Sequence, residues 1–217
     1  NKNKTDQNII VEKSQSKELK NIKISGIYDP AENDFNLNMW SQSSAENVRS
    51  SFARIKKINL SNASMELFEN TIFSYAYPPA DMDDKEFTEL KINWLIKNKK
   101  DDLIEEFLKK NNEFPNKNKI IQYLVDRNIS NANIKEGCEK VNFVGKDIKD
   151  PYLEKFKIYC LIFTDKKGEA NLLYDILKEQ GKSDKFFDDK ISYLLGISDK
   201  NDGKIKEDTL LNFYISS

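Results

Sequence analysis

The sequence predicts an all-α protein: a right-handed α-solenoid of helical hairpins, similar to tetratricopeptide repeats, with an irregular N-terminal arm. Three observations favour this fold. From residue 43 onward, apolar residues recur at spacings of three and four, the period of one helix face. Short polar breaks, some with Pro or Gly, separate these runs. Helix pairs are expected to begin near residues 83, 116 and 150, a roughly 33-residue interval close to the tetratricopeptide period. An irregular α-helical bundle is the alternative.

The N-terminal part of the chain has no helical pattern. Residues 1–20 carry only Ile9, Ile10, Val11 and Leu19 as strong apolar positions and are expected to form a flexible arm. Residues 21–43 contain apolar and aromatic side chains without helical spacing, so we expect an extended segment that lies on the first helices. We therefore divide the chain into an arm over residues 1–42 and a helical-repeat domain over residues 43–217.

Two helices are expected before the first pair of prolines. Ser43 and Glu46 have the spacing of a capping box, which predicts a helix over about 44–58. A second helix is expected over about 63–77. It must end before Pro78-Pro79, because proline disfavours the helical backbone at the residue before it.

Helix pairs follow, each with a polar turn between its two helices. The first pair flanks the turn Asn98-Lys99-Lys100 and ends at Pro115, and the second covers about 116–141. The third begins at Asp150-Pro151, since proline is tolerated in the first helical turn, and Gly181 stands where a C-terminal cap is expected. Apolar residues over about 186–213 indicate a last pair. Residues 94–110 resemble residues 160–179, including a Lys-Lys turn, which supports a repeat.

Several segments carry a resemblance to a known family. They are YPPADM at 77–82, ELKINWLIKNKKDDLIEEFL at 89–108, CEKV at 138–141, DPYLEKFKIYCLI at 150–162 and LLYDILKEQGKSDKFF at 172–187. On these segments, the chain from Trp40 to Gly196 resembles a family of uncharacterised, exported helical-repeat proteins of alphaproteobacteria. Leu153 stands where that family has a tryptophan. The resemblance implies a helical repeat and an envelope location, and it names no ligand or activity.

The composition excludes several functional classes. The chain has no histidine, which excludes Ser–His and Cys–His catalytic centres and histidine-based zinc sites. Its seven glycines are scattered, so no phosphate-binding loop is present and no cofactor is expected. Lys and Arg (35) balance Asp and Glu (36), and only three of these residues are arginines, so nucleic acid is not an expected partner. The sequence contains no run of 18 apolar residues, so it predicts no transmembrane helix.

The two cysteines bear on stability and on compartment. Cys138 and Cys160 fall on neighbouring helices of the predicted stack, and in the periplasm a disulfide between them would contribute about 3 kcal/mol. Two buried, reduced cysteines are the alternative. A cleaved export signal is one explanation for a chain that starts at Asn1 rather than Met. We expect a periplasmic or envelope-associated location, with the cytoplasm as the alternative.

Acidic and aromatic side chains supply the candidate sites. An acidic cluster at residues 81–86 fits a helix N-terminus better than a pair of catalytic carboxylates. Residues 199–205 resemble the start of a calcium-binding loop but lack the glutamate at its twelfth position, so no metal is expected. Four aromatic residues are the candidate partner contacts: Trp40, Tyr77, Trp94 and Tyr152.

These features favour a non-enzymatic interaction or scaffold module of the bacterial cell envelope, which binds a protein partner through its helical-repeat surface. Two alternatives are open. One is a helical enzyme that acts on cell-wall glycans through an acidic residue, although no glycosidase-like motif surrounds Glu46, Glu89 or Glu105. The other is a cytoplasmic adaptor with the same fold.

Overall fold

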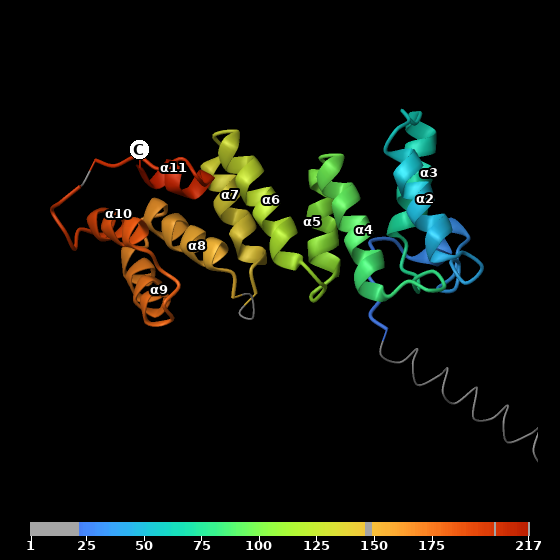
Figure 1. Ribbon diagram of the computed structural model, residues 1–217, viewed down its shortest axis with the longest axis horizontal. Coiled ribbons are helices and arrows are strands. Elements are labelled where there is room, and N and C mark those ends of the chain that lie inside the picture. The colour runs from blue at the N-terminus through green and yellow to red at the C-terminus, as the bar shows by residue number, and fades with distance from the viewer. Residues whose placement is uncertain (1–21, 146–148, 202, 217) are drawn as a thin grey trace, which may run out of the picture. The chain divides into compact units, whose positions relative to one another are not determined.

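The computed structural model describes residues 22–145, 149–201 and 203–216. Within these residues the protein is all-α, with ten α-helices, α2 to α11, and two short 3-10 helices (Figure 1). This confirms the predicted all-α class. The chain divides into two compact units, one ending at Lys117 and the other beginning at Asn118. Residues 1–20, predicted to be a flexible arm, lie outside the described residues.

The first unit contains four helices, α2 (Ala45–Ile55), α3 (Asn62–Phe73), α4 (Asp84–Lys97) and α5 (Asp101–Lys110). Serine begins α2 and α3: the hydroxyl oxygens of Ser44 and Ser61 accept backbone N–H bonds from the first turn of each helix. Ser43 is therefore not the cap that its spacing predicted. Its carbonyl oxygen instead accepts the backbone N–H of Ala80.

Aromatic side chains fill the centre of the first unit. The ring of Trp94, on α4, lies 5.3 Å from Phe68 and 5.7 Å from Phe73, both on α3. Phe73 also meets Phe107 of α5 edge to face at 6.5 Å. Because these rings connect α3 with α4 and α5, the first unit has one continuous core.

An extended segment over residues 22–28 lies on these helices, which agrees with the prediction for only the first part of residues 21–43. The backbone N–H groups of Ile27 and Tyr28 donate to the carbonyl oxygen of Phe73, and Tyr75 donates to Tyr28 at 3.1 Å. This pairing ends α3 at Phe73, four residues before the predicted end, because Ser74 takes extended backbone. The sequence did not predict the 3-10 helix η1 (Pro30–Asn33) that follows the paired residues.

Lys91 of α4 holds the extended segment from inside the unit. Its side chain is fully buried, and its Nζ donates to the carbonyl oxygen of Ser25 at 2.6 Å and lies 4.5 Å from the centre of the Phe87 ring. No carboxylate of the described residues forms an ion pair with it. Burial therefore lowers the pKa of Lys91 to about 7.

We expect the first unit to become more stable as the pH rises through this pKa. Lys91 has a pKa of about 7 in the folded protein and 10.5 when solvated, so unfolding takes up a proton between these values. The free energy of unfolding from urea titrations should therefore increase by about 1 to 2 kcal/mol from pH 7 to pH 9. Lys91→Met should abolish the increase. If the free energy of unfolding of Lys91→Met rises with pH as much as that of the unmodified protein, the increase comes from other titratable groups.

The second unit contains six helices: α6 (Lys117–Ser130), α7 (Ile134–Lys140), α8 (Pro151–Phe163), α9 (Lys167–Glu179), α10 (Lys185–Leu195) and α11 (Leu210–Ser216). The short η2 (Val141–Phe143) follows α7, and α8 packs along α9. The helix starts predicted near 83, 116 and 150 are confirmed at Asp84, Lys117 and Pro151. Gly181 follows α9 with a φ of 65°, the left-handed backbone expected at a C-terminal cap.

Two tyrosine hydroxyls tie α6, α8 and α11 together. The Tyr214 hydroxyl donates to the carbonyl oxygen of Ile129 at 2.7 Å. The Tyr152 hydroxyl donates to the Asp126 carboxylate and accepts the backbone N–H of Leu211. Burial raises the pKa of both Asp126 and Tyr152. These bonds fix the last helix on the second unit.

Three turns between consecutive helices share one backbone geometry. Each has a central residue with positive φ: Lys99 (52°), Ala132 (60°) and Asp165 (60°). In each turn the next residue donates its N–H to the carbonyl oxygen five residues earlier, which closes the preceding helix. The central residues follow one another at intervals of 33 residues. The turns α4–α5, α6–α7 and α8–α9 therefore repeat in both geometry and spacing.

Replacing Ala132 by Gly should stabilise the protein. Left-handed backbone, which Ala132 adopts, costs about 1 to 2 kcal/mol in a residue with a Cβ and little in glycine. Glycine also raises the entropy of the unfolded chain, which offsets part of this gain. We therefore expect the free energy of unfolding, measured in urea, to increase by about 0.5 to 1 kcal/mol. Ala53→Gly, at an exposed helical position of α2, is the control and should destabilise by about 1 kcal/mol. Loss of stability in both variants would contradict the account of the turn.

Candidate interaction site

A groove of about 420 Å³ opens between α2 and α3. Its lining is mainly apolar, with small polar side chains among the apolar ones. The lining residues are Trp40, Ser43, Asn47, Val48, Ser51, Phe52, Ile55, Leu60, Ser64, Leu67, Phe68, Thr71 and Ile72. None of these described residues is charged, so the groove suits an apolar occupant.

Helical spacing explains why the groove exists. Ser43, Asn47 and Ser51 follow one another at intervals of four, so they share one face of α2 and the turn before it. Ser64, Leu67 and Thr71, at intervals of three and four, share one face of α3, and Leu60 lies just before that helix. The small side chains in these rows leave a space that larger ones would fill.

The floor of the groove is part of the aromatic core, and its wall is exposed. Phe52 and Ile72 are 2% and 3% exposed, and Phe52 meets Phe68 edge to face at 5.7 Å. Leu67 is 64% exposed on the wall. An exposed leucine beside an apolar floor marks a surface that another side chain can cover.

Trp40 lies at the N-terminal end of the groove. Its ring meets Phe87 of α4 edge to face at 5.8 Å, and its indole N–H is buried without an acceptor among the described residues. At the same end, Arg49 of α2 donates to the Glu86 carboxylate of α4 at 2.7 Å. This end of the groove is therefore fastened to the start of α4.

The C-terminal end of α2 is basic. Arg54, Lys56 and Lys57 are exposed, and none forms an ion pair with a described carboxylate. Arg54 follows Ser51 by three residues, so it lies beside the face of α2 that lines the groove. Cations at a helix C-terminus complement the helix dipole, and here they also leave positive charge at one end of the groove.

The structure separates the four predicted partner contacts. Trp40 lines the groove. Tyr77 is half-buried in the extended segment, where its backbone N–H donates to the Leu37 carbonyl oxygen at 2.8 Å. Tyr152 is half-buried, and its hydroxyl is bonded inside the second unit. Trp94 is 1% exposed, so its assignment as a partner contact is wrong: the ring packs in the core.

The acidic cluster at the start of α4 has structural partners. The Asp83 carboxylate accepts the backbone N–H of Glu86 at 2.7 Å, which makes Asp83 the N-cap of α4. Asp84 accepts the backbone N–H of Lys23 at 3.3 Å, and Glu86 pairs with Arg49. Throughout the described residues, no group of three or more acidic or cysteine side chains could hold a metal ion.

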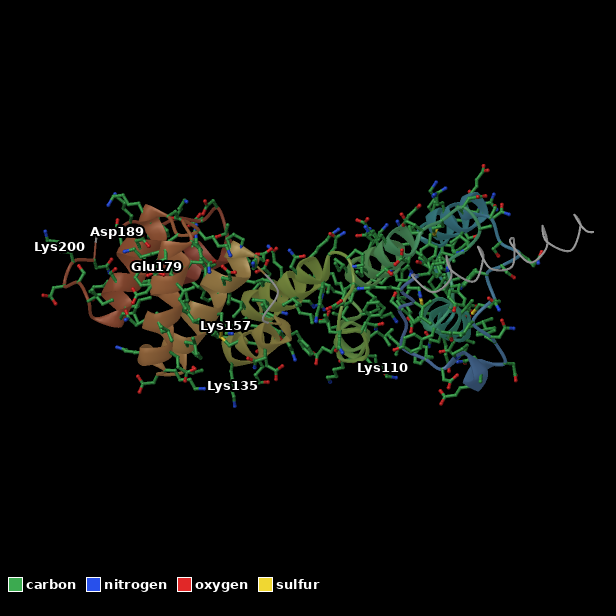
Figure 2. All side chains as sticks on the ribbon, turned by 90° about the horizontal axis from the view of Figure 1, so that it is seen from below. Lys110, Lys135, Lys157, Glu179, Asp189 and Lys200 are labelled. Atoms are coloured by element: carbon green, nitrogen blue, oxygen red, sulfur yellow. A yellow bond between two sulfur atoms is a disulfide. The ribbon has the colours of Figure 1, made fainter. Side chains whose placement is uncertain are left out.

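A disulfide joins α7 to α8 in the second unit. The sulfur atoms of Cys138 and Cys160 are 2.05 Å apart. Beside the bond lies a hollow of about 220 Å³, with Lys135, Lys157 and Lys166 in its lining. Lys135 and Lys157, both labelled in Figure 2, are exposed, and Glu139 shares the lining with them. These exposed lysines are typical of a solvated helix surface, so the groove between α2 and α3 is the stronger candidate site.

Comparisons with known proteins do not identify the chain. No protein-family model, no curated protein and no solved structure matches it. The resemblance to exported alphaproteobacterial proteins therefore stays a prediction. The longest helices that the structure describes have 14 residues, and none of the described helices is long and apolar enough to cross a membrane.

The sequence did not predict the groove. The core face of α3 was predicted correctly at Phe68 and Ile72, which are both covered by neighbouring rings or helices. The available signal was Leu67, an apolar residue on a second face of α3. A helix with apolar residues on two faces needs two partners, and the described residues supply only one.

Proposed function

We propose that the protein is a non-enzymatic interaction module that binds an apolar, acidic segment of a partner protein between α2 and α3. The uncharged, mainly apolar groove carries this proposal, with Leu67 exposed on its wall. Burying an apolar side chain contributes about 1.5 to 3 kcal/mol, so two or three of them from a partner provide a measurable affinity.

The basic end of α2 supports an acidic partner. Arg54, Lys56 and Lys57 attract acidic side chains that flank an apolar core, which mainly speeds association and fixes the direction of binding. The affinity should then fall as salt screens these exposed charges.

The repeated turns support a helical-hairpin repeat of the tetratricopeptide kind. Three turns, each with a left-handed residue at its centre, recur every 33 residues, close to the roughly 34-residue tetratricopeptide period. Modules built from such hairpins bind extended segments of other proteins on their helix surfaces. The groove in the first unit fits that mode of binding.

The disulfide supports a location in the cell envelope. Disulfides persist in oxidising compartments such as the bacterial periplasm and are rare in the cytosol. A periplasmic module is therefore our proposal, and free thiols in protein isolated from its native cell would favour the cytoplasmic adaptor.

Photo-crosslinking in the native cell tests the proposed function. A photoreactive amino acid is placed at Leu67 or, as the matched control, at Leu172 of α9, which is 62% exposed. We expect a discrete adduct from position 67 and none from position 172, with less adduct in the Arg54→Glu variant. Mass spectrometry should find an apolar segment with acidic neighbours in the crosslinked partner. Equal adducts from both positions, or none from position 67, would contradict the proposal.

A further inference from the structure

We infer that α4, α5 and the residues that follow α3 form a second peptide-binding site, separate from the groove between α2 and α3, and that residues 22–28 of the chain itself occupy it in the structure. The site accepts an extended segment with a glycine between a small hydroxyl residue and an apolar residue. A segment of another protein with this pattern binds there when residues 22–28 leave. The contacts of residues 22–28, the close approach of the backbone at Gly26 and the place of the segment in the chain support this inference.

Side chains of the site bind the backbone of the occupying segment. The Asn111 carboxamide donates to the Gly26 carbonyl oxygen at 2.8 Å and accepts the Gly26 N–H at 3.2 Å. Lys91 and Lys110 donate to the carbonyl oxygens of the residues on either side of Gly26, both at 2.6 Å. Asn111 is 7% exposed, and Lys91 is fully buried. Three consecutive residues are therefore recognised through backbone groups that any extended peptide presents.

Three positions of the segment determine which sequences the site accepts. A Cβ at position 26 would lie 2.7 Å from the backbone nitrogen of Tyr75, so only glycine fits there without a backbone shift. The Ser25 hydroxyl is hydrogen-bonded to the Thr88 hydroxyl at 2.8 Å, which favours serine or threonine before the glycine. Ile27, after the glycine, is 1% exposed, so that position takes an apolar side chain. The preferred ligand is therefore serine or threonine, then glycine, then an apolar residue.

The site is complete without its present occupant. Its hydrogen-bonding groups all lie between Phe73 and Asn111, and the helices that carry them share one aromatic core. Among the described residues no helix precedes residues 22–28, so this segment can leave the site without unfolding a described helix. The chain that follows is fastened separately, because the backbone N–H of Tyr77 donates to the Leu37 carbonyl oxygen at 2.8 Å. This fastening keeps residues 22–28 near the site and makes them an internal competitor.

The internal competitor sets the apparent affinity of the site for a free peptide. A segment tethered close to its site has a local concentration in the millimolar range or above, so a free peptide displaces it only with difficulty. A change that spoils the fit of the tethered segment and leaves the site intact therefore raises the apparent affinity for a free peptide. Gly26→Val is such a change, because the added side chain belongs to the segment and not to the site.

Binding of a labelled synthetic peptide to the full chain tests the inference. The peptide has the sequence of residues 22–29, and fluorescence anisotropy follows its binding. We expect the Gly26→Val protein to bind it about tenfold or more tightly than the unmodified protein does. Gly145→Val is the matched control, because a Cβ at Gly145 has no atom within 4 Å, and it should bind the peptide as the unmodified protein does. A Gly26→Ala peptide should bind the Gly26→Val protein about tenfold more weakly than the original peptide.

A second variant tests the site rather than its occupant. In the Gly26→Val protein, Asn111→Ala removes both hydrogen bonds to the glycine of the peptide, so the affinity for the peptide should fall about tenfold. Lys109→Ala, at an exposed position near the end of α5, is the control and should change the affinity less than about twofold.

Every outcome of the peptide experiment decides for or against the inference. If Gly26→Val leaves the first unit unfolded, the peptide should restore the native tryptophan fluorescence, because both tryptophans belong to that unit. Neither binding nor restoration, equal affinities of the Gly26→Val and unmodified proteins, or equal affinities for the two peptides would overturn the inference. None of these measurements involves the groove between α2 and α3, so crosslinking from position 67 decides the proposed function separately.

Discussion

Reduction of the disulfide between Cys138 and Cys160 is expected to lower the free energy of unfolding of the second unit by about 3 kcal/mol. The bond closes a loop between residues 22 apart in sequence, so it restricts the unfolded chain much more than the folded one. Urea unfolding followed by circular dichroism, with and without a reductant, measures the difference.

The two tryptophans provide an internal control for this experiment. Trp40 and Trp94 both belong to the first unit, so tryptophan fluorescence reports on that unit alone. The fluorescence transition should not respond to the reductant, and neither should any transition of the Cys138→Ala, Cys160→Ala double variant. A reductant effect of the same size on the fluorescence transition would show that it acts elsewhere than on this bond.

Replacing Trp94 by Ala should destabilise the first unit by about 4 kcal/mol, the cost of removing a fully buried aromatic ring. The ring lies between Phe68 and Phe73 of α3, so its loss leaves a cavity where α3 meets α4. The measurement is the midpoint of urea unfolding by circular dichroism, combined with the slope of the transition.

Trp40→Ala is the matched control for that prediction. The Trp40 ring is half-buried at the end of the groove and contacts Phe87, so its removal should cost less than half as much stability. The same loss of stability in both variants would mean that the two rings are equally buried, contrary to the structure.

Much of the helical pattern could be predicted from the sequence because strong local signals mark it. Pro151 at the first turn and Gly181 after the last turn mark the ends of the α8–α9 pair. The end of α3 could not be predicted in this way. Helical periodicity continues to Tyr75, but the backbone of Tyr28 pairs with that residue from 47 positions earlier, and this long-range pairing overrides the local preference.

The candidate site was harder to predict than the fold, since it depends on what covers each face. Trp40 and Trp94 are chemically identical, and only the three-dimensional packing places one at the groove and the other in the core. Local chemistry could suggest that Cys138 and Cys160 pair, but it could not decide between a disulfide and two thiols. The groove itself arises from small residues such as Ser51 and Ser64, which carry no functional signature.

The most direct test of the groove as a binding surface is the affinity of the crosslinked partner segment, measured by calorimetry against a matched pair of variants. Leu67→Asp and Leu172→Asp change leucines of nearly equal exposure, 64% and 62%, on different units. Burial of one leucine predicts a loss of about tenfold or more for Leu67→Asp, and less than about twofold for Leu172→Asp. Equal losses, or no loss in Leu67→Asp, would contradict binding between α2 and α3.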